Sequence, residues 1–176
     1  TSDQADVVVP DPVTVATVTP AYGPTAGGTR VTVQGTGFLP GTTVTFGGLP
    51  GTALTYNSGT SVTVTTPAQP AGAVDVTVTN TDTRSATMPN AFTYLVPPVV
   101  TTVTPGSGPA AGGTTVTITG SHFAPSATVR FGGDSATVLS RLADTGITVM
   151  TAAHAAGSVD VTVTNPDGQS ARAAEG

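Results

Sequence analysis

Two histidines are the first candidates for acid–base chemistry or metal binding in this chain of 176 residues. His122 and His154 have no cysteine to join them in a metal site, because the chain has no Cys at all. No G-x-S-x-G segment provides a serine nucleophile. We therefore expect both histidines to lie in surface loops. The sequence predicts no catalytic, cofactor-binding or metal site, and the chain is not expected to be an enzyme.

Carboxylates beside asparagines are the next candidates, because Ca²⁺ takes carboxylate and amide oxygens as ligands. Asp82 follows Asn80, and Asp167 follows Asn165, at matching positions of an internal repeat that is described below. Asn and Asp are also common in turns, where their side chains hydrogen-bond the nearby backbone. Turns are the favoured interpretation, and calcium binding near Asp82 and Asp167 is left open.

Exposed aromatic side chains could stack on sugar rings, and few are available. The chain has no Trp, and most of its five Phe residues fall at inward-facing positions. Tyr22 and Tyr56 remain as a candidate ligand platform. The second copy of the repeat has Ser107 and Arg141 at these positions, so the platform would belong to the first copy alone.

The charge of the chain excludes some partners. Ten acidic residues against five arginines give a net charge of -5 and an isoelectric point near 4.5, so we expect no nucleic-acid partner. No apolar run approaches the ~18 residues of a membrane span, so we expect no membrane insertion. The first residues, TSDQADVVVP, lack the regions of a signal peptide. We expect an extracellular or cell-surface protein in its mature form.

An internal repeat defines the organisation of the chain. The segment GPTAGGTRVTVQGTGF at 23–38 returns as GPAAGGTTVTITGSHF at 108–123, and AGAVDVTVTN at 71–80 returns at 156–165 with one change. Matching residues are always 85 apart, without insertions. The repeat predicts a domain at 11–95, a second domain at 96–176, and a strand-like segment at 1–10 before them.

Alternating apolar and polar residues predict strands in both copies. Val74, Val76 and Val78 alternate with Asp75 and Thr77, which is the period of a half-buried strand. Glycine pairs separate such segments. No helical pattern competes with this one. We predict an all-β fold of two tandem immunoglobulin-like β-sandwiches with about seven strands each.

The two copies resemble a known family. The combination of GPTAGGTRVTVQGTGF, TVTFGG, AGAVDVTVTN and AFTY is similar to the IPT/TIG domains, and the resemblance covers nearly the whole chain. It implies a seven-stranded immunoglobulin-like sandwich. Members of the family occur in surface receptors, Rel-type transcription factors, and bacterial secreted enzymes and surface arrays. For this sequence the resemblance implies a bacterial extracellular or surface protein.

The last strand of the repeat occurs once. Ala91-Phe92-Thr93-Tyr94 resembles the last strand of the family, but its counterpart would begin at residue 176, so the second domain is expected to lack that strand. In the other direction, Phe92 and Tyr94 correspond to Val7 and Val9. In one interpretation the chain is a fragment of a longer array, or tolerates a shorter edge. In the other, Val7, Val8 and Val9 form a donor strand that completes the second domain of a neighbouring molecule.

These observations favour a non-catalytic extracellular structural or adhesive protein, with stiff tandem modules that assemble head to tail into a fibre. The linker Leu95-Val96-Pro97-Pro98 restricts bending, which suits such a role. The alternative is an accessory carbohydrate- or protein-binding module of a secreted polysaccharide-active enzyme. No cofactor is expected, and the expected partners are other copies of the chain or a surface protein or glycan.

Overall fold

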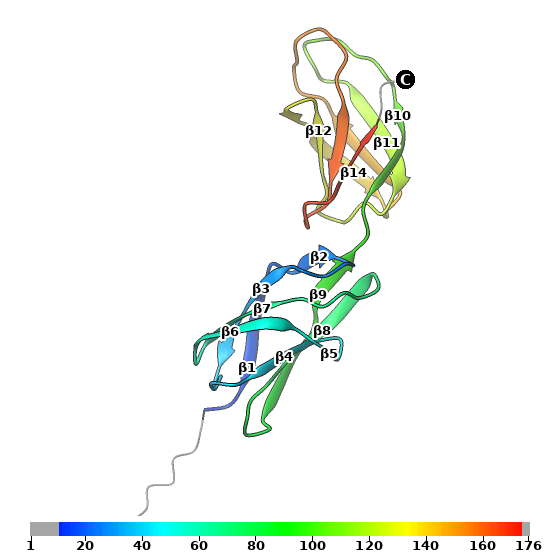
Figure 1. Ribbon diagram of the computed structural model, residues 1–176. Coiled ribbons are helices and arrows are strands. Elements are labelled where there is room, and N and C mark those ends of the chain that lie inside the picture. The colour runs from blue at the N-terminus through cyan, green and yellow to red at the C-terminus, as the bar shows by residue number, and fades with distance from the viewer. Residues whose placement is uncertain (1–10, 174–176) are drawn as a thin grey trace, which may run out of the picture. The chain divides into compact units, whose positions relative to one another are not determined.

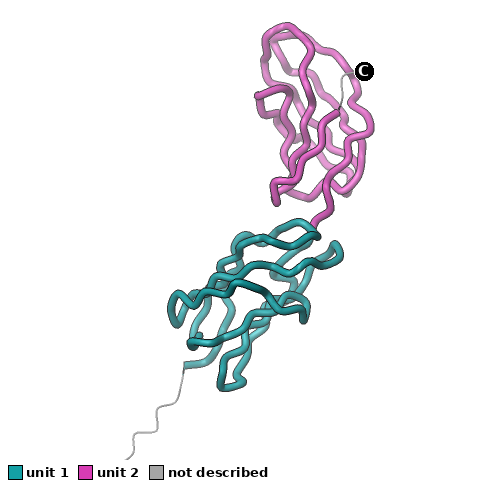
Figure 2. The backbone as a smooth tube through the Cα atoms, viewed as in Figure 1, with its two compact units in different colours: residues 1–94 teal, residues 95–176 magenta. Residues whose placement is uncertain are grey.

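The computed structural model describes residues 11–173, and every regular element in that range is a β-strand. The chain divides into two compact units between Tyr94 and Leu95 (Figures 1 and 2). The strands of the first unit are β1 (Thr14–Thr19), β2 (Tyr22–Pro24), β3 (Arg30–Thr36), β4 (Thr43–Phe46), β5 (Leu49–Pro50), β6 (Thr52–Ser58), β7 (Ser61–Thr65), β8 (Gly72–Thr79) and β9 (Ser85–Leu95). Those of the second are β10 (Val99–Thr104), β11 (Thr115–Ser121), β12 (Thr128–Phe131), β13 (Asp134–Ser135), β14 (Thr137–Leu142), β15 (Gly146–Met150), β16 (Val161–Thr164) and β17 (Ser170–Ala173).

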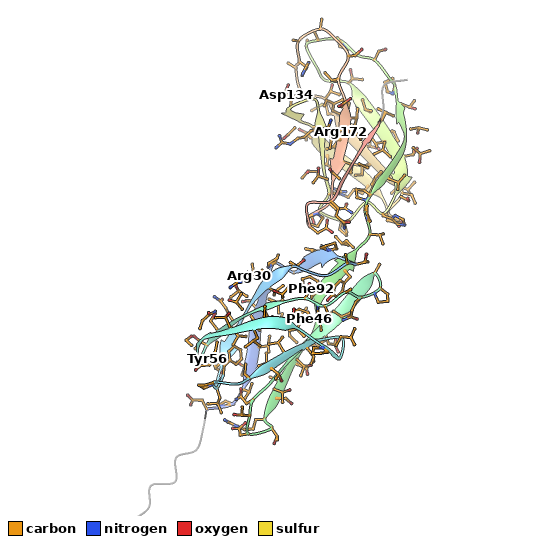
Figure 3. All side chains as sticks on the ribbon, viewed as in Figure 1. Arg30, Phe46, Tyr56, Phe92, Asp134 and Arg172 are labelled. Atoms are coloured by element: carbon orange, nitrogen blue, oxygen red, sulfur yellow. The ribbon has the colours of Figure 1, made fainter. Side chains whose placement is uncertain are left out.

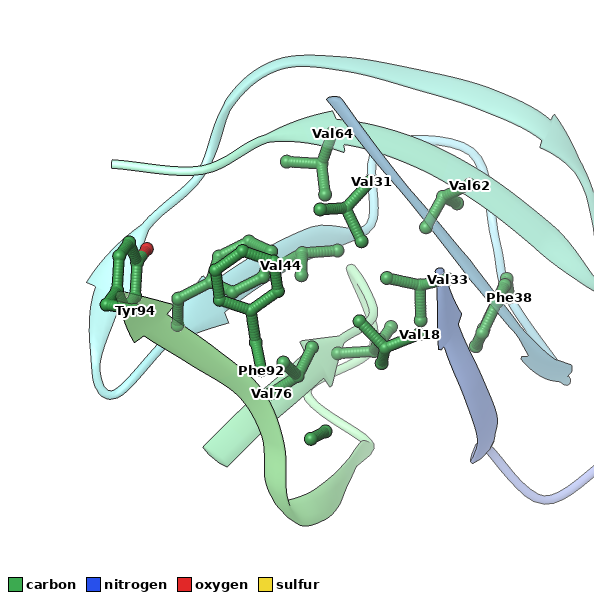
Figure 4. Packing of buried hydrophobic residues seen from close by; sticks show 13 residues of the cluster. Val18, Val31, Val33, Phe38, Val44, Val62, Val64, Val76, Phe92 and Tyr94 are labelled. Atoms are coloured by element: carbon green, nitrogen blue, oxygen red, sulfur yellow. The ribbon is translucent and has the colours of Figure 1, made fainter. Parts of the chain in front are cut away.

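Unit 1 is a sandwich of two sheets. One sheet has the strand order β1-β3-β7-β6, and the other has the order β2-β9-β8-β4-β5. The alternating valines of both sheets meet between them, and Val31, Val33, Val62 and Val64 are fully buried there (Figure 4). Their polar neighbours face outward, as the period of two requires.

A tight turn at a glycine pair precedes β3 in unit 1 and β11 in unit 2. Gly27 and Gly28 have φ values of 72° and 83°, and Gly112 and Gly113 have 75° and 79°. A side chain on Gly27 would lie 2.5 Å from the backbone of Pro67, and one on Gly112 equally close to Ala152. Only glycine fits these positions, which explains why the pair recurs in both copies.

Unit 2 repeats the same sandwich. Strands β10, β11, β12, β13 and β15 begin and end 85 residues after β1, β3, β4, β5 and β7. The sheet orders are β10-β11-β15-β14 and β13-β12-β16-β17. The prediction of an all-β chain with two tandem sandwiches is confirmed; the short strands β2, β5 and β13 are additions to the predicted set.

One part of the repeat is not matched in the described part of unit 2. β17 corresponds only to the first half of β9, because Ser170–Ala173 lies 85 residues after 85–88. β16 begins at Val161, although the counterpart of the first residue of β8 is Gly157. Within residues 95–173, no strand corresponds to β2. These three differences lie around the place where the second half of β9 packs in unit 1.

Candidate functional site

The second half of β9 carries two aromatic side chains into the core of unit 1. Phe92 is fully buried, and its ring centroid lies 5.5 Å from that of Phe46 and 5.0 Å from that of Tyr94 (Figures 3 and 4). Both contacts are edge-to-face, which is the arrangement that aromatic rings prefer. The Tyr94 hydroxyl donates a hydrogen bond to the Pro67 carbonyl at 2.9 Å, and burial raises its pKa.

The matching place in unit 2 is an open groove of about 940 Å³. Phe131 and Val161 line it where unit 1 has Phe46 and Val76. Phe131 is only half-buried, whereas Phe46 is fully buried. The rest of the lining includes Val100, Val103, Gly108, Ala152 and Val159. Among residues 11–173, no aromatic ring packs on Phe131 as Phe92 packs on Phe46, so this end of the core is open to solvent.

The groove also has a backbone edge without a sheet partner in the described residues. In unit 1 the first residues of β8 pair with the second half of β9: Gly72 with Tyr94, Ala73 with Thr93, and Val74 with Phe92. The counterparts of these β8 residues are 157–159, and the ladder between β16 and β17 begins only at Val161. Within residues 95–173 the groove therefore combines apolar lining with a backbone edge that has no sheet partner, which are the two features that bind an added β-strand.

Neither histidine belongs to a cluster of metal-ligating side chains in the described residues. No group of three or more His, Cys, Asp or Glu side chains in residues 11–173 could hold a metal ion. His154 lies at the rim of the groove, with its Nε2 atom 3.6 Å from Oδ2 of Asp134. His122 adopts a left-handed conformation with φ 60°, in place of Gly37 with φ 70°.

The repeated asparagines act in the structure as clamps of a loop. The amide group of Asn80, which is buried, donates to the Gly37 carbonyl at 2.7 Å and accepts from Thr42 at 2.7 Å. Asn165 is equally buried, and its amide donates to the His122 carbonyl at 2.9 Å. The neighbouring carboxylates take part in turns.

Asp82 and Asp167 both accept hydrogen bonds from residues two positions later. Asp82 pairs with Arg84 at 2.8 Å, and Asp167 accepts the Gln169 backbone N–H at 3.1 Å. These bonds are what turn chemistry predicts for the two carboxylates. A calcium ion at either position stays a prediction.

Tyr22 and Tyr56 lie on different sheets of unit 1. Tyr22 belongs to β2, in the five-stranded sheet. Tyr56 belongs to β6, at the edge of the other sheet (Figure 3). The Tyr56 hydroxyl donates to the Phe38 carbonyl at 3.3 Å, and 36% of the residue is exposed. Its counterpart Arg141 reaches the same loop of unit 2 by donating to the Ala124 carbonyl. The structure does not bring the two tyrosines together, and their role as a ligand platform stays a prediction.

Val7, Val8 and Val9 lie outside the described residues. The groove of unit 2, which would accept the donated strand, lies within the described residues. The sequence analysis did not name the residues that line it. The only signal for Phe131, Val159 and Val161 was indirect: they are the counterparts of the residues that hold Phe92 and Tyr94.

The two sandwiches define immunoglobulin-like modules, and their family is shown by direct comparison. The chain belongs to the IPT/TIG domain family, whose model matches residues 12–94 and again residues 98–175. The sequence-based recognition of tandem IPT/TIG domains is thus confirmed. Among residues 11–173, no helix is long and apolar enough to cross a membrane.

Similar proteins are much longer than this chain. Plexin-2 of Caenorhabditis briggsae is 35% identical over 114 residues, which are 63% of this chain and 6% of that protein. Human fibrocystin-L is 40% identical over 113 residues, covering 62% of this chain and 2% of that protein. The solved extracellular region of plexin A4 aligns with a TM-score of 0.51 and 24% identity, over 93% of this chain and 18% of that structure. The similarity to the plexin A4 structure shows only the fold of this chain.

Proposed function

We propose that this chain is a non-catalytic extracellular structural or adhesive protein, and that its second sandwich accepts a β-strand from another copy. The observation that carries the proposal is the open groove of unit 2, at the place where unit 1 holds its own Phe92 and Tyr94. The donor is the N-terminal segment with Val7, Val8 and Val9. Such a contact joins different surfaces of two identical molecules, so it builds an open head-to-tail fibre.

The spacing of the repeat supports this donor. β1 begins at Thr14 and β10 at Val99, 85 residues later. Val7 and Val9 therefore precede β1 by the same number of residues as Phe92 and Tyr94 precede β10. A donated segment would lead into the neighbouring molecule's first sandwich through a linker as long as the one that follows β9 within the chain.

The energetics predict a weak contact per molecule. Burial of a valine side chain stabilises by about 1.5–3 kcal/mol. Association costs about 4–15 kcal/mol, so two valines and a short ladder of hydrogen bonds roughly offset this cost. Assembly should thus depend steeply on protein concentration.

Sedimentation of the 176-residue chain from about 1 μM to about 1 mM tests the proposal. We expect the mass to rise with concentration, and deletion of residues 1–9 to leave a monomer. Deletion of residues 1–4 is the matched control and should preserve assembly. Val7→Asp should abolish assembly, whereas Val8→Asp, on the outward face of the strand, should not.

Two outcomes contradict the proposal. If the full chain is monomeric at every concentration, the groove is filled in another way, such as by further residues of a longer polypeptide. If deletion of residues 1–9 leaves the same oligomers, the chain associates through a different surface.

Glycan binding as an accessory module is the alternative function. It relies on Tyr22 and Tyr56, and their positions on different sheets do not support a shared stacking face. Its test is the loss of binding to soluble polysaccharides in the Tyr22→Ala and Tyr56→Ala variants.

A further inference from the structure

One carboxylate hydrogen-bonds the chain at the start of the second half of β9 in unit 1. Oδ1 of Asp75 accepts the backbone N–H of Asn90 at 2.9 Å. Asn90 has φ 50°, and the ladder between β8 and β9 shifts its register between Val74 and Val76 at this point. Asp75 therefore holds the chain where it turns from the first half of β9 into the half that carries Phe92.

The counterpart of Asp75 in unit 2 has a different partner. Oδ2 of Asp160 accepts a hydrogen bond from Nη1 of Arg172 at 3.0 Å. Arg172 stands where unit 1 has Thr87, which bonds Thr77 instead. The Arg172 side chain is 71% exposed, so this ion pair is held weakly and can be exchanged.

Asp160 and Arg172 lie beside the backbone edge of the groove. Together with Gly132, Ser158, Val159 and Thr162, they line a depression of about 440 Å³, and Val159 and Arg172 also line the groove itself. Figure 3 shows Arg172 on unit 2. The Asp160 carboxylate thus lies next to Val159 and Arg172, at the edge of the groove where an added strand would pair.

We propose that Asp160 is the positioning residue that sets the register of the strand bound in this groove, by exchanging Arg172 for a backbone N–H of that strand. The inference rests on the strand-acceptor function proposed above. The register of unit 1 places donor residue Val7 opposite Val159 and donor residue Val9 opposite Gly157. In this register donor residue Ala5 takes the position of Asn90, which residue 175 holds in the chain's own repeat, so the donated strand offers the Ala5 N–H to Asp160 in place of residue 175.

Details of the groove fit this register. Gly157 has φ 148°, close to the 142° of Gly72, which faces Tyr94 in unit 1. In this register donor residue Val7 takes the place of Phe92, which contacts Phe46, the counterpart of Phe131. Donor residue Val9 takes the place of Tyr94, whose hydroxyl donates to the carbonyl of Pro67, the counterpart of Ala152.

Peptide binding to the full chain tests the inference. The first probe is a labelled peptide of residues 88–96, which contains the strand that fills this place in unit 1, and the second is a peptide of residues 3–11. Fluorescence polarisation is measured at a protein concentration where the chain is monomeric. A version of the first peptide with Phe92→Ser and Tyr94→Ser is the control and should not bind.

Two variants should change affinity in opposite directions. Asp160→Ala should weaken binding about tenfold or more, because a hydrogen bond to a charged acceptor is lost. Arg172→Thr, which installs the residue of unit 1, should strengthen binding several-fold, because the competitor for Asp160 is gone. Asp144→Ala, an exposed carboxylate outside the groove lining, is the matched control and should leave affinity unchanged. A merely structural role of Asp160 would not give opposite signs.

The outcomes separate this inference from the proposed function. If the first peptide binds with both variant effects and the second peptide does not bind, Asp160 has its role and N-terminal donation is wrong. If the peptides bind and Asp160→Ala has no effect, or Arg172→Thr weakens binding, the role of Asp160 is wrong and the groove remains an acceptor. If the first peptide does not bind at all, the inference is overturned.

Discussion

Five strands of unit 2 repeat strands of unit 1 at a constant spacing of 85 residues, yet the cores of the two units end differently. In unit 1 the second half of β9 covers Phe46 with Phe92, whereas in unit 2 Phe131 is half-buried at the side of a groove. Apart from β2 and the first half of β8, the other strands of unit 1 have counterparts in unit 2. The comparison shows that this half-strand closes the core without being needed to define the rest of the sandwich.

The effect of one half-strand extends to its neighbours. A strand exists only where a partner takes up its backbone hydrogen bonds. In unit 1, β2 lies next to β9, and the Thr93 N–H donates to the Ala21 carbonyl at 2.9 Å. Residues 107–109 repeat the position of β2 but form no strand, and β16 is half as long as β8. The sheet of unit 2 is therefore open on both sides of the same gap.

The largest expected effect comes from equivalent phenylalanines. Phe46→Ala should destabilise unit 1 by about 3–5 kcal/mol, because it leaves a cavity against Phe92. Phe131→Ala should cost less than half as much, because that ring is already partly in water. Urea unfolding separates the units, since all three tyrosines (Tyr22, Tyr56 and Tyr94) lie in unit 1 and the chain has no Trp. Tyrosine fluorescence follows unit 1, and circular dichroism follows both. Equal losses of stability in the Phe46→Ala and Phe131→Ala variants would contradict the proposed difference between the two cores.

Completion of unit 2 should remove most of the difference. A chain in which the sequence of residues 90–95 is placed from position 175 onward should gain about 3 kcal/mol or more in the stability of unit 2, because two aromatic side chains become buried. The control carries serine at both aromatic positions and should gain little. Urea unfolding followed by circular dichroism measures the change. An unchanged unit 2 would show that the groove does not hold this strand.

The asparagine clamps should behave alike in both units. Asn80→Ala and Asn165→Ala should each destabilise their own unit by about 1–3 kcal/mol, because buried backbone groups lose their partners. Thermal unfolding of the two variants measures the losses. A loss confined to one unit would mean that the two sandwiches differ beyond the groove.

The smallest expected effect is a pH dependence that belongs to unit 1. Burial raises the pKa of Tyr94, so the unfolded chain releases this proton at a lower pH than the folded chain does. The stability that follows from the neutral hydroxyl is present below pH ~10 and is lost as the pH rises above it. Tyr94→Phe should remove this pH dependence. It should also lower the stability of unit 1 by about 1 kcal/mol, because the hydrogen bond to the Pro67 carbonyl is lost. Unit 1 unfolding measured between neutral and alkaline pH, with and without the substitution, checks both.

The repeat allowed the strands to be predicted because each period alternates valine with polar residues in the same register. The family assignment followed from the motifs around Gly27 and Gly112. The second half of β9 has no counterpart among residues 95–173, and the consequences of this were harder to see. Residues 107–109 repeat the position of β2 and residues 157–159 repeat the start of β8, and both form no strand where no partner lies beside them in the described residues.

The site was less predictable than the fold. Asn80 and Asn165 drew attention as possible calcium ligands, but an amide that clamps a loop has the same sequence signal as one that binds an ion. Asp160 and Arg172 meet through a ladder that places Thr162 opposite Arg172, and no local motif announces that contact. Tyr56 was expected as an exposed platform; 36% of it is exposed, its hydroxyl also bonds the Phe38 carbonyl, and its role as a platform stays a prediction.

The central claim is that the groove of unit 2 is a strand acceptor, and sedimentation of two chains tests it most directly. The first is the chain of 176 residues, and the second is the same chain with the sequence of residues 90–95 attached to fill its own groove. We predict that the mass of the first rises with concentration and that the second stays monomeric. Assembly of both chains to the same extent, or of neither, would contradict the claim.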